Sequence, residues 1–413
     1  MGKIGLVLCG GVAKGAYEAG VLKALAERQI YPDVIVGISA GAINGAFAAQ
    51  MLAIGQFTAA EVERELIYHW RETVDAHHLY HGFDRNDHAP LEQRSLRSLF
   101  DRLGIDPLRR QYRPRIGFDS LFAFEQLVRG DFISLINHDF VRGMLETYLH
   151  FPPVIKRDVT LSVVKTDLKG STTLTGDMKL ATDYSAFDEF RWRAGIEEAD
   201  WDAMNARMQD SILASSSFPF VFPPVETPRK SGDASGFFVD GGLMDSAPIG
   251  HAIKLDPEVD TILVVSGSTL VEPPDSDPKT FHEVLGRVFS LLAGRFVIQN
   301  YHKVLQCNDR ITRLDALVKR GKSGNVLRNS PNEDLAKLAG FKDLDDFLSR
   351  RVVRLVPILP NPGLPGNVFD GFFQPELRAQ YIEKGYLDAV AALGREARIS
   401  ASEPIASPFQ SLV

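Results

Sequence analysis

The chain has 413 residues, of which 45% are hydrophobic, and 46 Lys and Arg against 53 Asp and Glu give it a formal net charge of −7. This is an ordinary globular composition, long enough for two or three domains or for one α/β domain with insertions. A pI of about 5.8 argues against a nucleic-acid-binding protein, which needs a basic face. Only Cys9 and Cys307 are present, which excludes a disulfide framework and a zinc-finger ligand set and is typical of reduced thiols in the cytoplasm.

Two strand-turn-helix units are predicted at the N-terminus. Residues 3–8 form an apolar run that ends at two glycines, and residues 15–28 carry apolar side chains at helical spacing. Residues 34–36 form a second apolar run, followed by a helix of small residues over 42–51. The first run has too small a charged region before it for a signal peptide, and no run of 18 apolar residues occurs anywhere. Such units predict an α/β fold with a mostly parallel sheet and helices on both faces.

Later apolar runs, at residues 159–164, 236–239 and 261–265, extend the predicted sheet. Two insertions lie between the strands, at about 74–118 and at 183–210. Residues 85–115 contain eight Arg and four acidic residues, whereas 183–210 contain eight acidic residues and three Arg. Both are interpreted as solvated helices and loops.

The alternative is that the insertions form a lid or a membrane-facing surface. The apolar side chains available for insertion into a membrane are those of Phe100, Leu121, Phe122 and Phe124. In this hypothesis the Arg-rich insertion helps the protein dock on anionic bilayers. The arginines concerned are Arg94, Arg97, Arg109 and Arg110.

A serine between glycines is the first candidate catalytic group. Ser39 lies in the pentapeptide GISAG, after the run at 34–36 and before the helix at 42–51, with Gly37 and Gly41 on either side. Flanking glycines are needed where a nucleophilic serine occupies a sharp, strained turn, because larger side chains would collide there. The partial positive charge of the helix N-terminus then favours a developing alkoxide.

A glycine-rich turn ends the first predicted strand. It consists of Gly10, Gly11, Val12, Ala13, Lys14 and Gly15. Beside a nucleophilic serine, converging N–H groups of such a turn would stabilise a tetrahedral oxyanion. A phosphate-binding loop would need Lys-Ser or Lys-Thr at its end, where Ala16 and Tyr17 follow the last glycine. A dinucleotide-binding turn would need glycine at Val12 and an acidic residue after the second strand, and the chain has neither.

The candidate general base follows the run at 236–239. Asp240 precedes Gly241 and Gly242, and α/β enzymes collect site residues at the ends of strands. Alone, this tripeptide is typical of an ordinary turn. Beside Ser39, the Asp240 carboxylate can act directly as the base if its pKa is raised toward neutral pH.

The ten histidines offer two alternatives. In a Ser-acid-His triad the base would be His251, His282 or His302. None of these lies in a turn at a strand end, as Asp240 does. An HHxxH cluster at His77, His78 and His81 could bind a metal. Because no acid or Cys completes the cluster at a fixed spacing, it is interpreted as a solvated helix end, and no metal or cofactor is expected.

Taken together, the ordered motifs resemble those of the patatin-like phospholipase family. The matching segments are residues 10–22 (GGVAKGAYEAGVL), 37–45, 166–170, 214–224 (ASSSFPFVFPP), 240–248 and a closing helix at 375–393. The similarity covers about residues 3–270. The resemblance implies a three-layer α/β/α fold with helical insertions and a Ser-Asp dyad that hydrolyses acyl esters of lipids.

The resemblance also implies roles for single residues. Ser39 would be the nucleophile and Asp240 the base and then the acid. The oxyanion donors would be the N–H groups of Gly10, Gly11 and Val12. The supporting motif would comprise Lys14, at the family's basic position, with Gly15, Gly37, Gly41, Gly241 and Gly242.

The sequence departs from the family pattern at two places. Val12 stands where the family most often has a third glycine, and a β-branched residue is strained there if its φ is positive, although its N–H can still donate. Asp245, Ser246 and Ala247 replace a stretch that commonly contains Asn. The support of Asp240 therefore differs from the family pattern.

These observations predict a catalytic domain over residues 1–270, a C-terminal helical extension over 271–399 packed on the same domain, and a tail over 400–413. The leading hypothesis is a cytoplasmic lipid acyl hydrolase of phospholipase A or lysophospholipase type that contacts a membrane surface peripherally. Its partner would be a phospholipid or other lipid ester, without nucleic acid, and the sequence leaves open whether a protein activator is needed. The alternatives are an acyltransferase with the same Ser-Asp site and a lipid-binding regulatory protein without turnover.

Overall fold

The N-terminal apolar runs form the centre of the main sheet. The computed structural model describes residues 2–81, 94–106, 111–112, 125, 129, 134–151, 154–174, 180–194, 201–229, 235–268, 277–323 and 350–399. Two strands, β1 (Lys3–Leu8) and β2 (Val34–Ile38), pair in parallel at its centre. The other strands of this sheet are β5 (Val159–Leu174), β6 (Leu180–Trp192), β7 (Val225–Thr227), β8 (Gly236–Asp240), β9 (Val259–Val265) and β10 (Arg354–Ile358).

The strand order is β10-β9-β1-β2-β5-β8-β7, with β6 paired to β5. Pairing is parallel from β10 through β5 and antiparallel where β6 and β8 join β5 and where β7 joins β8. A separate two-stranded sheet consists of β3 (Ile105–Asp106) and β4 (Gln111–Tyr112). The mostly parallel central sheet confirms the prediction from the sequence.

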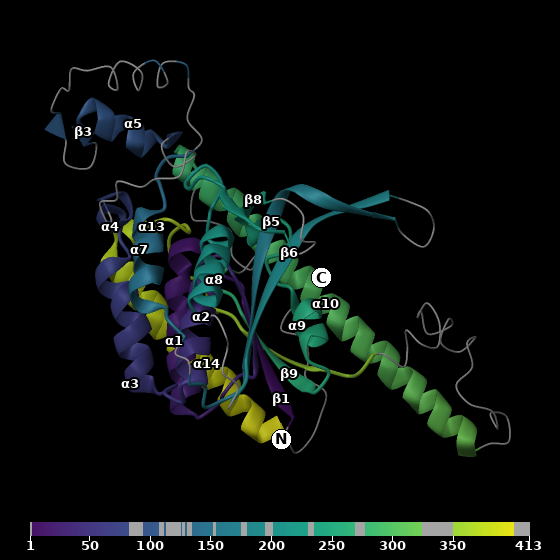
Figure 1. Ribbon diagram of the computed structural model, residues 1–413. Helices are drawn as coiled ribbons and strands as arrows, with labels where there is room; N and C mark the ends of the chain where they lie inside the picture. Colours follow the sequence, from purple (N-terminus) through teal and green to yellow (C-terminus); the bar gives the residue numbers. More distant parts are fainter. Residues whose placement is uncertain are drawn as a thin grey trace.

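Helices cover both faces of the sheet, because both faces are apolar. Leu6 and Leu8 of β1 pack into one hydrophobic cluster, whereas Val7 and Cys9, the residue directly after β1, pack into another. The first cluster includes residues of α1 (Gly15–Glu27), α2 (Ala40–Ala53) and α14 (Pro375–Ile399). The second includes residues of α9 (Ile249–Leu255) and α10 (Phe281–Ser323). Figure 1 shows these two helical layers on opposite sides of β1 and β9, as the three-layer prediction requires.

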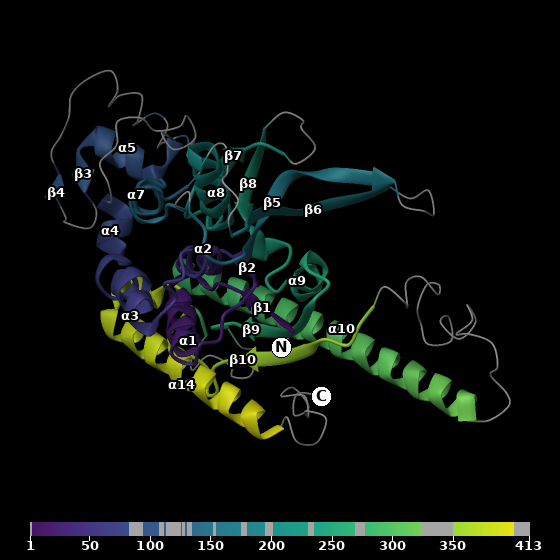
Figure 2. The same ribbon diagram turned by 60° about the horizontal axis from the view of Figure 1, so that its bottom comes forward.

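The described residues include further α-helices. They are α3 (Ala59–Val62), α4 (Ala76–His81), α5 (Leu96–Leu103), α7 (Asp139–Tyr148), α8 (Trp201–Ser215) and α13 (Asp370–Phe373). Figures 1 and 2 both show the β5–β6 ribbon and the C-terminal part of α10 extending away from the rest of the fold. Among the described residues, no helix combines the length and apolar character that a membrane span requires.

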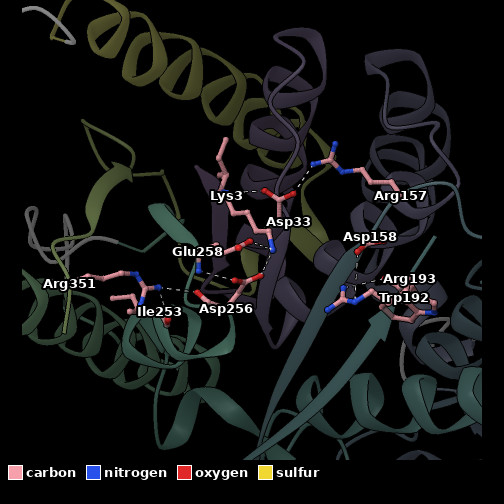
Figure 3. A network of polar contacts seen from close by, with 11 residues as sticks. Lys3, Asp33, Arg157, Asp158, Trp192, Arg193, Ile253, Asp256, Glu258 and Arg351 are labelled. Carbon is pink, nitrogen blue, oxygen red and sulfur yellow. Dashed lines mark hydrogen bonds and ion pairs between the residues drawn. The ribbon is translucent and has the colours of Figure 1, made fainter. Parts of the chain in front are cut away.

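Ion pairs fasten the loops at the amino ends of the central strands (Figure 3). Lys3 Nζ contacts Asp256 Oδ2 at 2.8 Å and Glu258 Oε2 at 2.7 Å, which ties the start of β1 to the loop before β9. Asp33, before β2, accepts a hydrogen bond from the Ile4 N–H at 3.0 Å and pairs with Arg157 at 2.9 Å. The opposite edge of the sheet, where the parallel strands end, carries the candidate site.

Part of the acidic insertion is a strand and not a helix or loop. Residues 183–192 belong to β6, which pairs with β5 from Val159↔Trp192 to Leu174↔Leu180. Phe190 and Trp192 are buried in the core, and the exposed Arg191 lies between them. Buried and exposed side chains alternate here with the two-residue period of a strand. This alternation was not predicted from the sequence, because only charges were counted there.

The C-terminal region also contributes to the sheet. The sequence predicts helices there, and α10 and α14 are helical, but Arg354–Ile358 form β10 and pair in parallel with β9. This run of five residues has the apolar character of a buried strand. The predicted tail at 400–413 lies outside the described residues.

Candidate active site

Ser39 occupies the turn between β2 and α2, as the motif predicts. Its backbone has φ 56° and ψ −130°, an unusual conformation for a non-glycine residue. The turn is closely packed, because a Cβ on Gly37 would lie 2.5 Å from the Gly41 carbonyl oxygen and one on Gly41 would lie 2.4 Å from the Leu8 oxygen. The two flanking glycines are therefore required by space, and the side chain of Ser39 sits at the N-terminus of α2.

The glycine loop after β1 lies against this turn. A Cβ on Gly10 would lie 2.4 Å from the Ile38 carbonyl oxygen and 2.9 Å from Ser39 Cβ. Gly10, Gly11 and Val12 all have positive φ, at 69°, 133° and 57°. The strain foreseen at Val12 is therefore present.

One of the three predicted oxyanion donors is unsuitable. The Gly10 N–H donates to Glu18 Oε1 at 2.7 Å, inside the protein, and so cannot also face a substrate oxyanion. The N–H groups of Gly11 and Val12 donate to no other described residue. The prediction for Gly10 is wrong because the sequence does not reveal the buried acceptor behind the loop.

Asp240 reaches Ser39 by a route that differs from the one that the sequence suggests. Its strand, β8, is antiparallel to β5 and pairs with the part of β5 that continues beyond β2, with Lys165 opposite Asp240. Val164, the residue before Lys165, pairs with Ile38, the residue before Ser39. The chain of β8 therefore runs back toward the edge of the sheet where β2 ends, and it stops there at Asp240.

The carboxylate of Asp240 is buried and faces the hydroxyl of Ser39. Burial raises the pKa of Asp240 to about 6, while the Ser39 hydroxyl and the Gly242 N–H act in the opposite direction. Asp240 Oδ1 accepts from the Gly242 N–H at 2.8 Å. Within the described residues, Oδ2 has no partner at full hydrogen-bond geometry. Such an oxygen is suited to accept a proton when a substrate aligns the serine.

The glycines and the unusual segment after Asp240 support this geometry. A Cβ on Gly241 would lie 2.3 Å from the Val164 carbonyl oxygen. Ser246 Oγ donates to the Gly242 carbonyl at 2.7 Å. Asp245 Oδ1 accepts from the Ala247 N–H at 3.1 Å and from Asn300 Nδ2 at 2.8 Å. The segment that replaces the family's Asn-containing stretch is thus held by α10.

The end of α8 links Ser39 and Asp240, and these contacts were not foreseen. The Ser39 N–H donates to Ser215 Oγ at 3.0 Å, and Ser215 Oγ donates to the Val164 carbonyl at 2.5 Å. Two residues later, the Ser217 carbonyl accepts from the Asp240 N–H at 3.0 Å. The only sequence signal was the ASSSFP segment, to which the resemblance assigned no role.

Lys14 and Gly15 end the glycine loop, and α1 begins at Gly15. Lys14 is buried, which lowers its pKa to about 8, and its Nζ makes a long hydrogen bond of 3.5 Å to the Leu364 carbonyl. A Cβ on Gly15 would lie 2.6 Å from Ala40 Cβ. Gly15 therefore permits the close approach of the starts of α1 and α2.

Among the histidine alternatives, His251 makes contacts of its own. His251 Nε2 lies 2.9 Å from Ser162 Oγ, and its ring stacks on Phe187 with centroids 3.9 Å apart. His302 lies on α10, as does the backbone of His282. In the described part of the chain, no group of three His, Cys, Asp or Glu is arranged to hold a metal ion, and the HHxxH cluster occupies nearly the whole of the short helix α4.

The predicted bilayer-binding arginines are only partly described. Arg97 is buried and pairs with Asp139 at 2.6 Å, so its charge is used inside the protein and the prediction is wrong for this residue. Arg94 and the half-buried Phe100 are described. The remaining residues of that hypothesis, Arg109, Arg110, Leu121, Phe122 and Phe124, lie outside the described residues.

An apolar cavity of about 290 Å³ opens beside Ser39. Its wall contains Val12 of the glycine loop, Phe47 of α2 and Trp70. Further along, it is lined by aromatic and aliphatic side chains, among them Phe140, Met144, Phe218, Phe222, Leu285 and Phe373. A cavity of this composition is suited to hold a hydrocarbon chain.

Comparison with known proteins places the chain in a family. A family model described as patatin-like phospholipase matches residues 6–253. Lysophospholipase nte1 of Aspergillus terreus is 53% identical over 47 residues, which are 11% of this chain and only 3% of that protein. The crystal structure of VipD from Legionella pneumophila aligns with a TM-score of 0.37 at 14% identity, covering 95% of this chain and 67% of that one. Because the family model spans more than half of the 413 residues, the chain belongs to the patatin-like phospholipase family.

Proposed function

We propose that the protein is a lipid acyl hydrolase of phospholipase A or lysophospholipase type, with Ser39 as nucleophile and Asp240 as base. The observation that supports it most strongly is the position of Ser39, which lines the apolar cavity and faces the buried carboxylate of Asp240. Family membership supports the same class of reaction. His251 is engaged with Ser162 and Phe187, which favours a dyad over a triad.

In the first half of the proposed reaction, Ser39 Oγ attacks the ester carbonyl carbon and its proton passes to Asp240 Oδ2. The carbonyl oxygen becomes an oxyanion, which the N–H groups of Gly11 and Val12 stabilise. When the tetrahedral intermediate collapses, the ester C–O bond breaks and Asp240 returns the proton to the departing alcohol. The acyl group remains on Ser39.

In the second half, water replaces the alcohol. Asp240 takes a proton from the water as it attacks the acyl-enzyme carbonyl, and the same two N–H groups stabilise the second oxyanion. Collapse breaks the bond to Ser39 Oγ, which regains its proton from Asp240. The products are a fatty acid and the free enzyme, and the scheme needs no metal or cofactor.

The acyl chain is proposed to occupy the cavity, and the exposed apolar side chains at its mouth to contact the lipid surface. Phe373, which lines the cavity, is 64% exposed, and Phe220 is 63% exposed with φ 70°, strained for an aromatic residue. The Phe220 carbonyl accepts from the N–H of Leu135, an exposed residue that lines the cavity. Such a rim suits a protein that draws substrate from a membrane or micelle.

A direct test combines product analysis with covalent labelling. The wild type is expected to release free fatty acid from phosphatidylcholine or lysophosphatidylcholine dispersions, and a fluorophosphonate probe is expected to attach to Ser39, located by mass spectrometry of the labelled peptide. Ser39→Ala should lose both properties and keep the thermal unfolding of the wild type. A folded wild type that neither releases fatty acid nor takes up the probe would contradict the proposal.

A further inference from the structure

A fully buried glutamate lies directly behind the glycine loop. Glu18, on α1, has no exposed surface. Its Oε1 accepts from the Gly10 N–H at 2.7 Å, and its Oε2 accepts from Asn44 Nδ2 at 3.0 Å. Burial of a carboxyl group is costly and raises the pKa of Glu18 to about 8. The proposed reaction does not use Glu18 as acid or base, so its burial calls for another explanation.

The conformation of the glycine loop must be stabilised by its surroundings. Three successive positive φ angles, at Gly10, Gly11 and Val12, persist only where the surroundings fix them. The flanking residues are held by backbone contacts, from the Cys9 N–H to the Val265 oxygen and from the Ala13 N–H to the Val368 oxygen, both at 3.0 Å. Of the three N–H groups in between, that of Gly10 is turned inward by Glu18. Those of Gly11 and Val12 make no such bond to the described residues.

Asn44 fixes the orientation of Glu18. Its Oδ1 accepts from Trp70 Nε1 at 2.8 Å, so its Nδ2 must face the other way, where it donates to the Gly15 carbonyl at 2.9 Å and to Glu18. Asn44 is itself fully buried. Glu18 therefore meets a donor at each of its two oxygens, an arrangement that a glutamine amide cannot satisfy.

The hydrogen bonds form one chain from the cavity wall to the glycine loop, because Trp70 lines the cavity. We propose that Glu18 is a positioning residue, which with Asn44 holds the glycine loop against the cavity wall so that the N–H groups of Gly11 and Val12 face the oxyanion. This inference rests on the proposed function and adds a residue to it. Since Glu18 does not line the cavity, its loss should affect kcat more than KM.

The test uses Glu18→Gln with a short soluble ester. The new amide must place its NH₂ group against a donor, either the Gly10 N–H or Asn44 Nδ2, so the loop loses its fixed position. We expect kcat to fall about 10- to 100-fold, as for other small displacements of catalytic groups, with KM within about twofold of the wild type. The second-order rate of inactivation by a fluorophosphonate, whose phosphoryl oxygen would occupy the oxyanion position, should fall by a similar factor.

Tyr17→Phe is the matched control. Tyr17 is the neighbour of Glu18 on α1, is equally buried, and donates to Asp388 on α14 at 3.1 Å, away from the loop. Its loss should lower thermal stability and leave kcat within twofold. A folded Glu18→Gln protein with kcat within twofold of the wild type would overturn the inference, as would an equal loss of kcat in Tyr17→Phe.

A second variant tests the positioning role of Glu18 if Glu18→Gln does not fold. Asn44→Ala keeps the contact of Glu18 with Gly10 and removes the group that orients it, so kcat should fall about tenfold at near-constant KM. Unchanged kcat in a folded Asn44→Ala protein would then refute the positioning role. The wild-type reaction with ester and probe separates this outcome from failure of the proposed function, in which the wild type itself would be inactive.

Discussion

Ser215 accepts a hydrogen bond from the backbone N–H of Ser39 at 3.0 Å, so the last residue of α8 is attached directly to the strained turn that contains Ser39. The same segment accepts the Asp240 N–H two residues later, at the Ser217 carbonyl. Three parts of the chain that are distant in sequence are thus fixed relative to one another. The spacing of Ser39 and Asp240 depends on this connection.

Ser215→Ala is expected to reduce both stability and activity. The Ser39 N–H would be left buried without its acceptor, which costs about 1–3 kcal/mol, and the turn would move, with kcat lower by about tenfold. Urea unfolding and ester hydrolysis measure the two effects. Ser211→Ala is the control, because Ser211 is buried one turn earlier on α8 and its Oγ donates a hydrogen bond to Asp188 at 2.7 Å. Equal loss of kcat in both variants would count against a specific role of Ser215.

Asp240→Asn is expected to stabilise the protein at neutral pH while it abolishes activity. Burial raises the pKa of Asp240 from 3.8 to about 6, so the folded state favours the neutral carboxyl. This stabilisation is complete below the ordinary pKa and is lost as the pH rises through about 6. The amide stays neutral, so the variant should be more stable above pH 6 by up to about 3 kcal/mol.

The measurement for this prediction is urea unfolding of wild type and Asp240→Asn at pH 4 and pH 8. The difference in the free energy of unfolding should be small at pH 4 and should favour the variant at pH 8. If the stability advantage of Asp240→Asn over wild type were smaller at pH 8 than at pH 4, the carboxylate would not be held at a raised pKa.

Substitutions at Val12 test the strain in the glycine loop. Val12→Ala and Val12→Gly both remove the packing of the valine side chain, but only glycine adopts φ 57° without steric cost. The glycine variant should therefore be the more stable of the two by about 1 kcal/mol, the reverse of the usual order. Urea unfolding of the two variants measures this difference. Greater stability of Val12→Ala would mean that the loop backbone changes its conformation to avoid the positive φ at this position.

Polar substitutions at the cavity mouth test the contact with lipid. Phe220 and Val288 are exposed and do not line the cavity, and Val288 lies on the same side of α10 as the lining residue Leu285, three positions earlier. Phe220→Ser with Val288→Ser should weaken binding to phosphatidylcholine vesicles about tenfold, because several apolar groups no longer enter the interface, and should leave hydrolysis of a soluble ester unchanged. Leu387→Ser, at an exposed leucine of α14, is the control. Equal vesicle binding by all three proteins would place the contact elsewhere.

Local sequence patterns predicted most strands of the sheet and both residues of the candidate dyad. The runs that became β1, β2, β8 and β9 are continuous and apolar, and the glycines around Ser39 are required by the backbone itself. What the sequence did not reveal depends on partners distant in the chain. The antiparallel course of β8, the acceptor role of Ser215 and the inward turn of the Gly10 N–H toward Glu18 are examples.

Glu18 shows why such features are hard to foresee. The only signal is an acidic residue in a helix whose neighbours, among them Tyr17 and Ala19, are all buried. The charged strand β6 was missed for the opposite reason, because its acidic residues suggested solvent exposure while Phe190 and Trp192 faced the core. In both cases the tertiary neighbours decide where a charge lies.

In the proposed reaction Asp240, without a histidine, activates Ser39. The most direct measurement is the rate of fatty-acid release from phospholipid vesicles and from a soluble ester by folded wild type, Asp240→Asn and His251→Ala. If the dyad operates, Asp240→Asn should lose activity on both substrates, by about 10³-fold or more, whereas His251→Ala should keep its activity. Substantial activity in Asp240→Asn, or loss of activity in His251→Ala, would contradict the dyad.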